Sequence, residues 1–382
     1  MNATLLDLSP ALQLLLLGAA IAIVPAWAVW RRHGAAGAAR WHALTVFTLF
    51  LTFDLVLFGA FTRLTDSGLG CPDWPGCYGS ASPLGAQEEI RAAQDAMPTG
   101  PVTRGKAWIE MVHRYIATAL GALITASMLA AWALRRRGPA AGPSPGWATA
   151  AFAWVCLQGA FGALTVTMKL YPAVVTLHLL GGYAGLLLLT AQAQAGAARL
   201  HLPAVVHGAA YAVLMLLFVQ SALGGWVSTN YAVLACSDFP TCQGSWWPTM
   251  DFEHGFTIRR DLGMSARGEP LPFEALTAIH YTHRLAAVVV LLAMAVLGVA
   301  LLRKRDATLR RFGWGLVALS AWQLASGLSN VVLGWPMLAA LAHTGGAGAA
   351  IAWLTSLIVR AHRAKSAAAP LSSPLHDLHS KR

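Results

Sequence analysis

Four histidines stand out because the sequence places them in matching pairs within long apolar segments. His113 and His178 lie in the first half of the 382-residue chain, and His283 and His343 in the second half. Each falls within about two turns of one end of its segment, at a depth where a polar side chain normally has a partner or a function. Neutral imidazole is a good axial ligand for haem iron, and two imidazoles on opposite helices can sandwich a flat macrocycle. We therefore expect one haem site in each half, with these histidines as ligands of the iron.

The two halves differ one helical turn before the first histidine of each pair. The first half reads EMVHR over 110–114, and the second reads HYTHR over 280–284. Because residues three apart share a helix face, Glu110 would lie beside the haem edge. A carboxylate in a partly desolvated pocket can transfer protons, which predicts a reactive first site and an electron-carrying or structural second site. The alternative is an interfacial acid in which Glu110 pairs with Arg114 or with a lysine of the loop. Arg114 and Arg284 are candidates for contacts with haem propionates or lipid phosphates.

A tandem repeat orders these residues. The segments CPDWPGCYG at 71–79 and CSDFPTCQG at 236–244 share the pattern Cys-x-Asp-aromatic-Pro-x-Cys-x-Gly at an offset of 165 residues. His178 and His343 match at the same offset, and the dipeptides that begin with His113 and His283 match at an offset of 170. Several matches in the same order indicate two copies of one structural unit.

The composition requires a membrane fold. The chain is 57% hydrophobic and 11% charged, whereas a soluble domain carries about twice that charged fraction. Nine segments reach roughly the 20 residues that cross a bilayer. These segments are 11–30, 42–63, 108–134, 147–168, 172–194, 205–228, 275–302, 311–334 and 337–360. We expect an all-α, polytopic membrane protein with two tandem, pseudo-symmetric four-helix transmembrane bundles and one extra N-terminal transmembrane helix.

The repeat and the apolar segments divide the chain into four parts. Residues 1–41 hold the extra N-terminal helix and a basic loop. Residues 42–200 form the N-terminal bundle with the site predicted to be reactive, and residues 201–363 form the C-terminal bundle with the site predicted to be electron-carrying or structural. Residues 364–382 are a short polar tail that we expect to be disordered.

The distribution of positive charge predicts the orientation in the membrane. The net charge is +11, and most of the lysines and arginines fall on one side when the nine segments alternate across the bilayer. The positive-inside rule then places the N-terminus outside, the C-terminus in the cytoplasm, and the long loops 64–107 and 229–274 outside. The haem sites are expected towards this outer face. Nucleic-acid binding is disfavoured, because the positive charge follows the membrane sides instead of forming one patch.

Two cysteine pairs lie in the predicted outer loops. Cys71 and Cys77 are six residues apart with a proline between them, as are Cys236 and Cys242. The chain can turn back within each loop, and the outer compartment of a bacterium is oxidising, which favours one disulfide in each loop. A metal site and redox-active thiols are the alternatives. Cys156, within an apolar segment, is expected to be a packed, small apolar residue.

Three other side chains admit two interpretations each. Trp74 and Phe239 either pack down as part of a lid over the bundles or anchor the chain at the headgroup level. Asp54, near the middle of an apolar segment, either belongs to a proton path or is a hydrogen-bonded structural acid.

The ordered motifs resemble those of the haem A synthase family. The segments that carry the resemblance are GAFTRLTDSGLGCPDWPGCYG at 59–79, EMVHR at 110–114, LHLLGG at 177–182, HYTHR at 280–284 and AHTGG at 342–346. The resemblance extends over roughly 42–360. It implies two four-helix bundles with pseudo-twofold symmetry, and a membrane enzyme that oxidises the C8 methyl group of haem O to the formyl group of haem A.

The resemblance also implies residue roles. His113 and His178 would hold the substrate haem O, Glu110 would be the catalytic carboxylate, and His283 and His343 would ligate a resident haem b. The cysteine pairs match the disulfide positions of the family. The extra helix at 11–30 departs from the eight-helix plan of the family, and the role of the histidine at 280 stays open.

The partners implied are the lipid bilayer of the bacterial inner membrane, haem O synthase and an unidentified electron donor, and a homo-oligomer stays open. Three rival hypotheses use the same sequence. A dihaem b-type cytochrome that only carries electrons would need the four histidines but not Glu110. A haem transporter or chaperone would release its haem unchanged, and a transporter without haem would bind none.

Overall fold

The computed structural model describes residues 9–32, 37–135 and 144–368, and these residues form nine helices long and apolar enough to cross a membrane. The prediction of an all-α polytopic membrane protein is therefore confirmed. The nine helices are α1 (Ser9–Arg32), α2 (Gly37–Leu64), α4 (Arg104–Arg135), α5 (Pro145–Thr167), α6 (Pro172–Ala193), α7 (Ala204–Thr229), α9 (Phe273–Leu302), α10 (Ala307–Val332) and α11 (Met337–Ala368).

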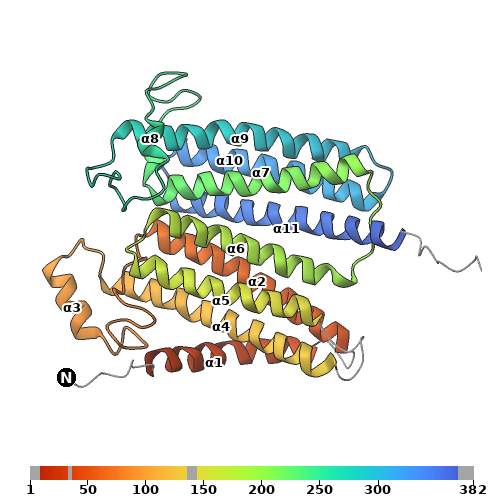
Figure 1. Cartoon of the computed structure of the whole chain (residues 1–382), viewed down its shortest axis with the longest axis horizontal. Helices are drawn as coiled ribbons and strands as arrows, with labels where there is room; N and C mark the ends of the chain where they lie inside the picture. The colour runs from red at the N-terminus through yellow and green to blue at the C-terminus, as the bar shows by residue number, and fades with distance from the viewer. Residues whose placement is uncertain (1–8, 33–36, 136–143, 369–382) are drawn as a thin grey trace, which may run out of the picture.

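The helices form two bundles that lie side by side (Figure 1). In the first bundle, α4 and α6 each pack against both α2 and α5, so α4 and α6 occupy opposite corners. In the second bundle, α9 and α11 each pack against both α7 and α10 in the same way. The bundles meet along α2 and α6 on one side and α7 and α11 on the other. This arrangement places the histidine-bearing helices of each copy across the bundle axis from one another.

Hydrogen bonds join the two bundles at one end of the interface. The Arg63 guanidinium donates to the Ser228 carbonyl over 2.6 Å, and the Tyr231 hydroxyl donates to Asp66 Oδ1 over 2.8 Å. Ser228 stands 165 residues after Arg63, and Tyr231 stands 165 residues after Asp66. Each of these residues therefore contacts its own repeat equivalent across the pseudo-twofold axis. The Arg63 guanidinium also stacks on the Tyr231 ring, 4.1 Å from its centroid.

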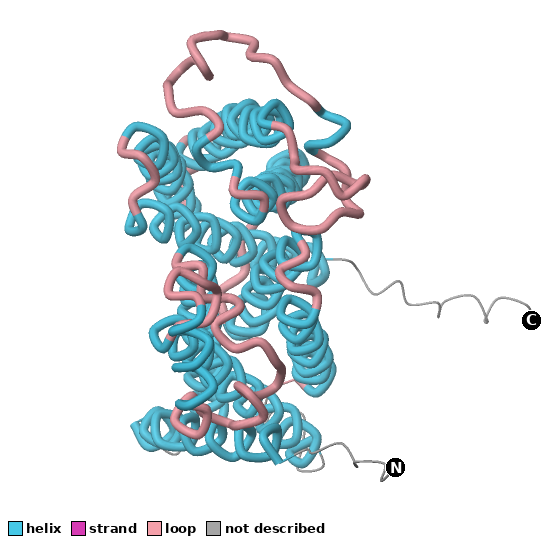
Figure 2. Tube along the Cα trace, turned by 90° about the vertical axis from the view of Figure 1, so that its left-hand side faces the viewer, coloured by secondary structure: helices cyan, strands magenta, loops and turns pink. Residues whose placement is uncertain are grey.

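The long connections gather at this end of the molecule (Figure 2). They include two short helices, α3 (Gln87–Ala96) and α8 (Phe252–Gly255). The sequence analysis treated the segment that contains α3 as irregular. Ile90 of α3 is buried in one cluster with the cysteines Cys71 and Cys77. A single buried isoleucine gives too weak a periodic signal to predict a helix from the sequence.

The extra helix α1 packs along α4 and is part of the first bundle. A Cβ atom at Gly18 would lie 2.7 Å from Cγ2 of Thr118, and Ala22 is buried with Ala119 and Leu123. The matching face of α9 instead exposes large aliphatic side chains, namely Val288, Val289 and Leu292. Small residues on α4 thus make room for α1 where α9 presents an apolar surface suited to lipid.

We expect Gly18→Leu to destabilise the protein by about 1–3 kcal/mol, because the new side chain must displace Thr118 and the backbone of α4. Thermal unfolding of the detergent-solubilised protein measures this effect. Leu16→Val is the control, since Leu16 is 63% exposed on the other side of α1. Equal unfolding temperatures for the two variants would show that α1 does not pack tightly on α4.

Two expectations from the sequence are wrong. Cys156 is exposed on α5 and does not pack in the interior. Helix α11 continues to Ala368, so the first residues of the predicted tail are helical. The rest of that tail, 369–382, lies outside the described residues.

Asp54 lies on an exposed face of α2. It precedes Gly59, which faces His113, by five residues, or about 140° around the helix. This position does not support a place for Asp54 in a proton path inside the first bundle.

Candidate functional site

Each of the four histidine rings contacts a glycine on a neighbouring helix. A Cβ atom at Gly59 of α2 would lie 3.1 Å from Cε1 of His113, and one at Gly162 of α5 would lie 3.6 Å from Cε1 of His178. The second bundle repeats these contacts, at 3.0 Å for Gly224 with His283 and 3.1 Å for Gly327 with His343. The glycines leave space for the rings on the inner faces of the helices. The rings of each pair are close enough to interact electrostatically.

The second ring nitrogens differ between the bundles. Among the described residues, Nδ1 of His113 and of His178 is buried without a hydrogen-bond partner. In the second bundle, the Gln220 amide lies 3.0 Å from Nδ1 of His283, and the Ser326 hydroxyl lies 3.0 Å from Nδ1 of His343. Such contacts fix the orientation of a metal-binding histidine. Side-chain contacts at Nδ1 therefore hold the second pair, whereas neither histidine of the first pair has such a contact.

Gln220 and Ser326 were not predicted as site residues from the sequence. A signal was present, because the repeat places Leu55 and Phe161 at the equivalent positions of the first bundle. A polar residue on an apolar helix in only one of two copies marks a difference in function or partner.

Two glycines that follow His178 and His343 pack against side chains of the neighbouring helix. A Cβ atom at Gly181 would lie 1.9 Å from the Gln158 amide nitrogen, and one at Gly346 would lie 2.6 Å from that of Gln323. These glycines accommodate glutamines from the neighbouring helix. Close packing against the neighbouring helix therefore explains these two glycines.

Glu110 is buried, at 4% exposure, beside the loop that follows α2. Its Oε2 accepts a hydrogen bond of 2.8 Å from the backbone N–H of Cys71, and its Oε1 forms an ion pair with Arg114. The alternative of an ion pair with Arg114 is thus present in the structure. The ion pair also holds the carboxylate one turn from His113 on the same helix.

The two arginines hold the loops that bear the cysteine motifs, 71–80 and 236–245, here called the first and second cap. Arg114 Nη1 donates to the carbonyls of Asp73 over 2.9 Å and Pro75 over 3.1 Å. Arg284 Nη1 donates to the carbonyls of Asp238 over 2.8 Å and Thr241 over 3.0 Å. These contacts fasten each cap to the helix that carries the first histidine. The predicted contacts with propionates or lipid phosphates are not needed to explain the arginines.

The caps have the same construction. Disulfides Cys71–Cys77 and Cys236–Cys242 close them, which confirms the first of the alternatives for the cysteines. In each cap the second cysteine begins a tight turn whose two central residues have positive φ, and the glycine of the motif is the second of them. Trp74 and Phe239 are 47% and 56% exposed, which fits a headgroup anchor and not a lid.

The aspartate of the motif explains how this turn is stabilised. In the second cap, the Thr241 hydroxyl and the backbone N–H groups of Gly244 and Gln243 donate to the Asp238 carboxylate. These hydrogen bonds lower the pKa of Asp238 from 3.8 to about 2. Asp73 accepts the equivalent two backbone hydrogen bonds in the first cap.

A depressed pKa in the folded protein has a defined consequence for stability. The contribution of Asp238 is present above its unfolded pKa and is lost as the pH falls through about 2. We expect the unfolding temperatures of the wild type and of Asp238→Asn to differ near neutral pH and to converge between about pH 4 and 2. Thermal unfolding at several pH values measures this. A wild-type unfolding temperature that stays above that of Asp238→Asn even at the lowest pH would contradict the prediction.

Comparisons with known proteins cover the segment of the chain that holds all of these motifs. Residues 16–356 match the COX15-CtaA family, described as cytochrome oxidase assembly protein. The chain is 37% identical over 315 residues to the haem A synthase of Shewanella oneidensis. The alignment covers 81% of this chain and 93% of that protein. The chain belongs to the haem A synthase family.

More distant relatives agree with this assignment. The haem A synthase of a Chelativorans species is 29% identical over 79% of this chain and 86% of its own length. That of Halalkalibacterium halodurans is 27% identical over 75% of this chain and 85% of its own length. The resemblance predicted from the motifs is confirmed, and with it an oxidoreductase that acts on haem O. The match begins inside α1, further towards the N-terminus than the motif resemblance extended.

In this member of the haem A synthase family, His280 of the second half occupies the repeat position of Glu110 in the first half. It is buried, its Nδ1 lies 2.8 Å from the Ala232 carbonyl, and its Nε2 accepts from Arg284 over 3.3 Å. A neutral imidazole both donates and accepts, so His280 can link the Ala232 carbonyl, in the segment before the second cap, to Arg284 without a charge. This contact gives a structural role to a residue that the sequence left open.

Proposed function

We propose that this chain is a haem A synthase, which oxidises the C8 methyl group of haem O to a formyl group within the membrane. The observation that carries the proposal is the pairing of imidazoles in both bundles, with a buried carboxylate beside only one pair. The family assignment supports the reaction class. Imidazole pairs on opposite corners of a four-helix bundle, each against a glycine, suit a flat, iron-containing ligand.

The two pairs have different ligands in this proposal. His113 and His178 hold haem O, and later haem A, in the first bundle. His283 and His343 hold a resident haem b in the second bundle. The contacts of Gln220 and Ser326 with the second pair support this division, because a permanent ligand benefits from histidines in fixed orientations. The first pair lacks such contacts, which suits a site whose ligand must be exchanged.

Glu110 is the proposed catalytic carboxylate. Oxidation of a methyl group to a formyl group releases protons as electrons pass to the haem, and a buried carboxylate on the same face as a haem ligand can take up such a proton. When bound, haem iron supplies the oxidation chemistry. Arg114 and the Cys71 N–H orient the carboxylate and stabilise its charge, and the first cap covers it.

The cellular setting completes the proposal. The chain lies in the bacterial inner membrane, with the N-terminus outside, the C-terminus in the cytoplasm and the haem sites near the outer face. The charge distribution supports this orientation. Haem O synthase supplies the poorly soluble substrate, and a separate donor exchanges electrons through the haem of the second bundle.

Expression with haem O synthase in cells that lack haem A tests the reaction directly. Chromatography of extracted haems is expected to show haem A only when this chain is present. A folded protein that accumulates haem O alone would favour the transporter or electron-carrier hypotheses. A purified protein without a Soret band would favour a transporter without haem.

A further inference from the structure

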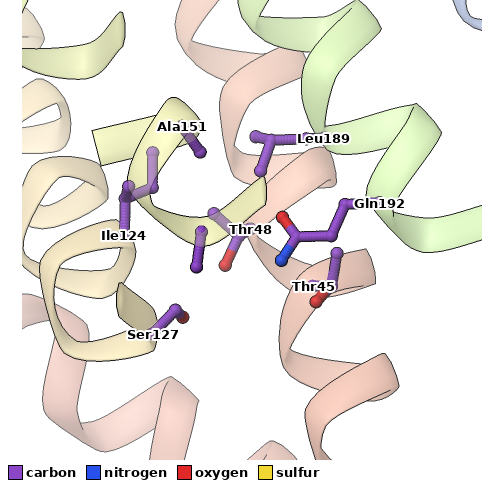
Figure 3. Close-up of a pocket in the computed structure, with 8 residues that line it drawn as sticks. Thr45, Thr48, Ile124, Ser127, Ala151, Leu189 and Gln192 are labelled. Carbon is purple, nitrogen blue, oxygen red and sulfur yellow. The ribbon is translucent and has the colours of Figure 1, made fainter. Parts of the chain in front are cut away.

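The two bundles differ in the half that lies away from the caps. There, Thr45 and Thr48 of α2, Ser127 of α4 and Gln192 of α6 surround a cavity in the first bundle (Figure 3). The repeat offsets place apolar residues at the four equivalent positions of the second bundle. These residues are Ala210, Val213, Leu297 and Leu357, and all four are buried in its main apolar cluster. One copy is therefore polar where the other has a packed apolar core.

The cavity has the size of a water site. The remaining lining residues are Ile124, Ala148, Ala151 and Leu189. The space open to the centres of water-sized molecules is about 10 Å³, close to the minimum of roughly 10–15 Å³ that holds one water. A purely apolar cavity of this size would remain dry, whereas a polar one is occupied when it offers two to four partners.

The lining side chains offer these partners. The Thr45 hydroxyl donates to the Trp41 carbonyl over 3.0 Å, and the Thr48 hydroxyl donates to the Leu44 carbonyl over 2.8 Å. Because the hydrogen of each hydroxyl is used within α2, its oxygen is left to accept a hydrogen bond from the cavity. The Gln192 amide lies next to both threonines and can donate as well as accept (Figure 3).

We propose that the first bundle binds water at this site and that the second bundle has no equivalent site. A polar, hydrated cavity replaces the interlocking side chains that make a core rigid. The distal half of the first bundle is thus less tightly packed than that of the second. On the proposed function, on which this inference rests, haem O must enter and haem A must leave the first bundle, while the haem of the second bundle stays. Looser packing in the first bundle suits this exchange.

Hydroxyl-radical labelling of the detergent-solubilised protein tests the proposal, because radiolysis of bound water oxidises the adjacent side chains. Oxidation at Ile124 and Leu189 is expected to exceed that at Met294 and Leu354, the equivalent residues of the second bundle. Methionine is intrinsically the more reactive side chain, so residue type works against this result. Oxidation at Ile124 and Leu189 that is no greater than at Met294 and Leu354 would overturn the proposal.

The double variant Thr48→Val/Gln192→Leu carries the residues of the second bundle and is close to isosteric with the wild type. It is expected to lower labelling at Ile124 and Leu189 several-fold. Thr125→Val is the matched control, since Thr125 is on the same helix as Ser127 but does not line the cavity. Unchanged labelling in a folded double variant would also overturn the proposal, and if that variant does not fold, the comparison within the wild type decides. Labelling does not depend on haem A formation, so a failure here is distinct from a failure of the proposed reaction.

Discussion

Glu110→Gln is expected to lower haem A formation by roughly 100-fold or more while both haems remain bound, because general acid–base groups contribute about 10²–10⁴ to rate. Glutamine has nearly the same shape as glutamate, and its amide oxygen can still accept from the Cys71 N–H. It cannot take up a proton from the substrate. Chromatography of haems from cells that also express haem O synthase measures the product, and the Soret absorbance of the purified protein measures bound haem.

The same variant separates a catalytic role of Glu110 from a purely structural one. If the carboxylate only anchors the first cap through Arg114, its loss should lower the unfolding temperature and the haem content together, with residual haem A in proportion to bound haem. His280→Gln in the second half is the matched control, since His280 occupies the equivalent repeat position and contacts Arg284 as Glu110 contacts Arg114. Full haem A formation by a folded Glu110→Gln variant would favour the electron carrier, which uses the histidines and not the carboxylate.

The sequence was sufficient for the architecture because the bilayer imposes simple rules. Each backbone polar group must be satisfied inside its own segment, so long apolar runs become helices. All nine predicted segments are helical, with ends that differ by no more than five residues except at the end of α11, which continues eight residues further. The repeat then placed the helices of His113 and His178, and those of His283 and His343, in equivalent places. Opposite corners followed from the even spacing of four helices around a bundle.

The contacts around the histidines could not be predicted in the same way. Gln220 meets His283 across 63 residues of sequence, and Arg114 meets the Asp73 carbonyl across 41. Such contacts depend on the rotation of each helix and on the path of each cap, which an apolar run does not specify. A backbone carbonyl also leaves no trace in residue type. The arginines were therefore assigned to propionates or phosphates, and the acceptors of the caps were missed.

The repeat itself held information that motif matching left unused. Matching searches for identity between copies, whereas Gln220, Ser326 and Gln192 are informative because the other copy has an apolar residue at each position. Two copies under the same membrane constraints share what the fold needs. Positions where only one copy keeps a buried polar side chain are where function or partners differ.

Replacement of single histidines is expected to remove haem from one bundle at a time. His113→Ala and His178→Ala should lose haem O and haem A but keep the second haem, and His283→Ala and His343→Ala should do the reverse. The reason is that each pair lies inside its own bundle, with each ring against a glycine of that bundle. Haem extraction and quantification per polypeptide measure this, and loss of all haem from every folded variant would show that the sites are not separate.

A graded result is expected for residues that act through the histidines. Gln220→Ala leaves His283, the proposed ligand, in place but removes its contact at Nδ1, and second-sphere changes of this kind typically lower metal affinity about 10–100-fold. Leu55→Ala, at the equivalent position of the first bundle, is the matched control and should leave haem in the second bundle unchanged. Because the first pair has no such neighbour, the first bundle should bind its haem more weakly than the second in the wild type. Equal retention of haem by both bundles during dilution in detergent would contradict the division into a resident and an exchanging site.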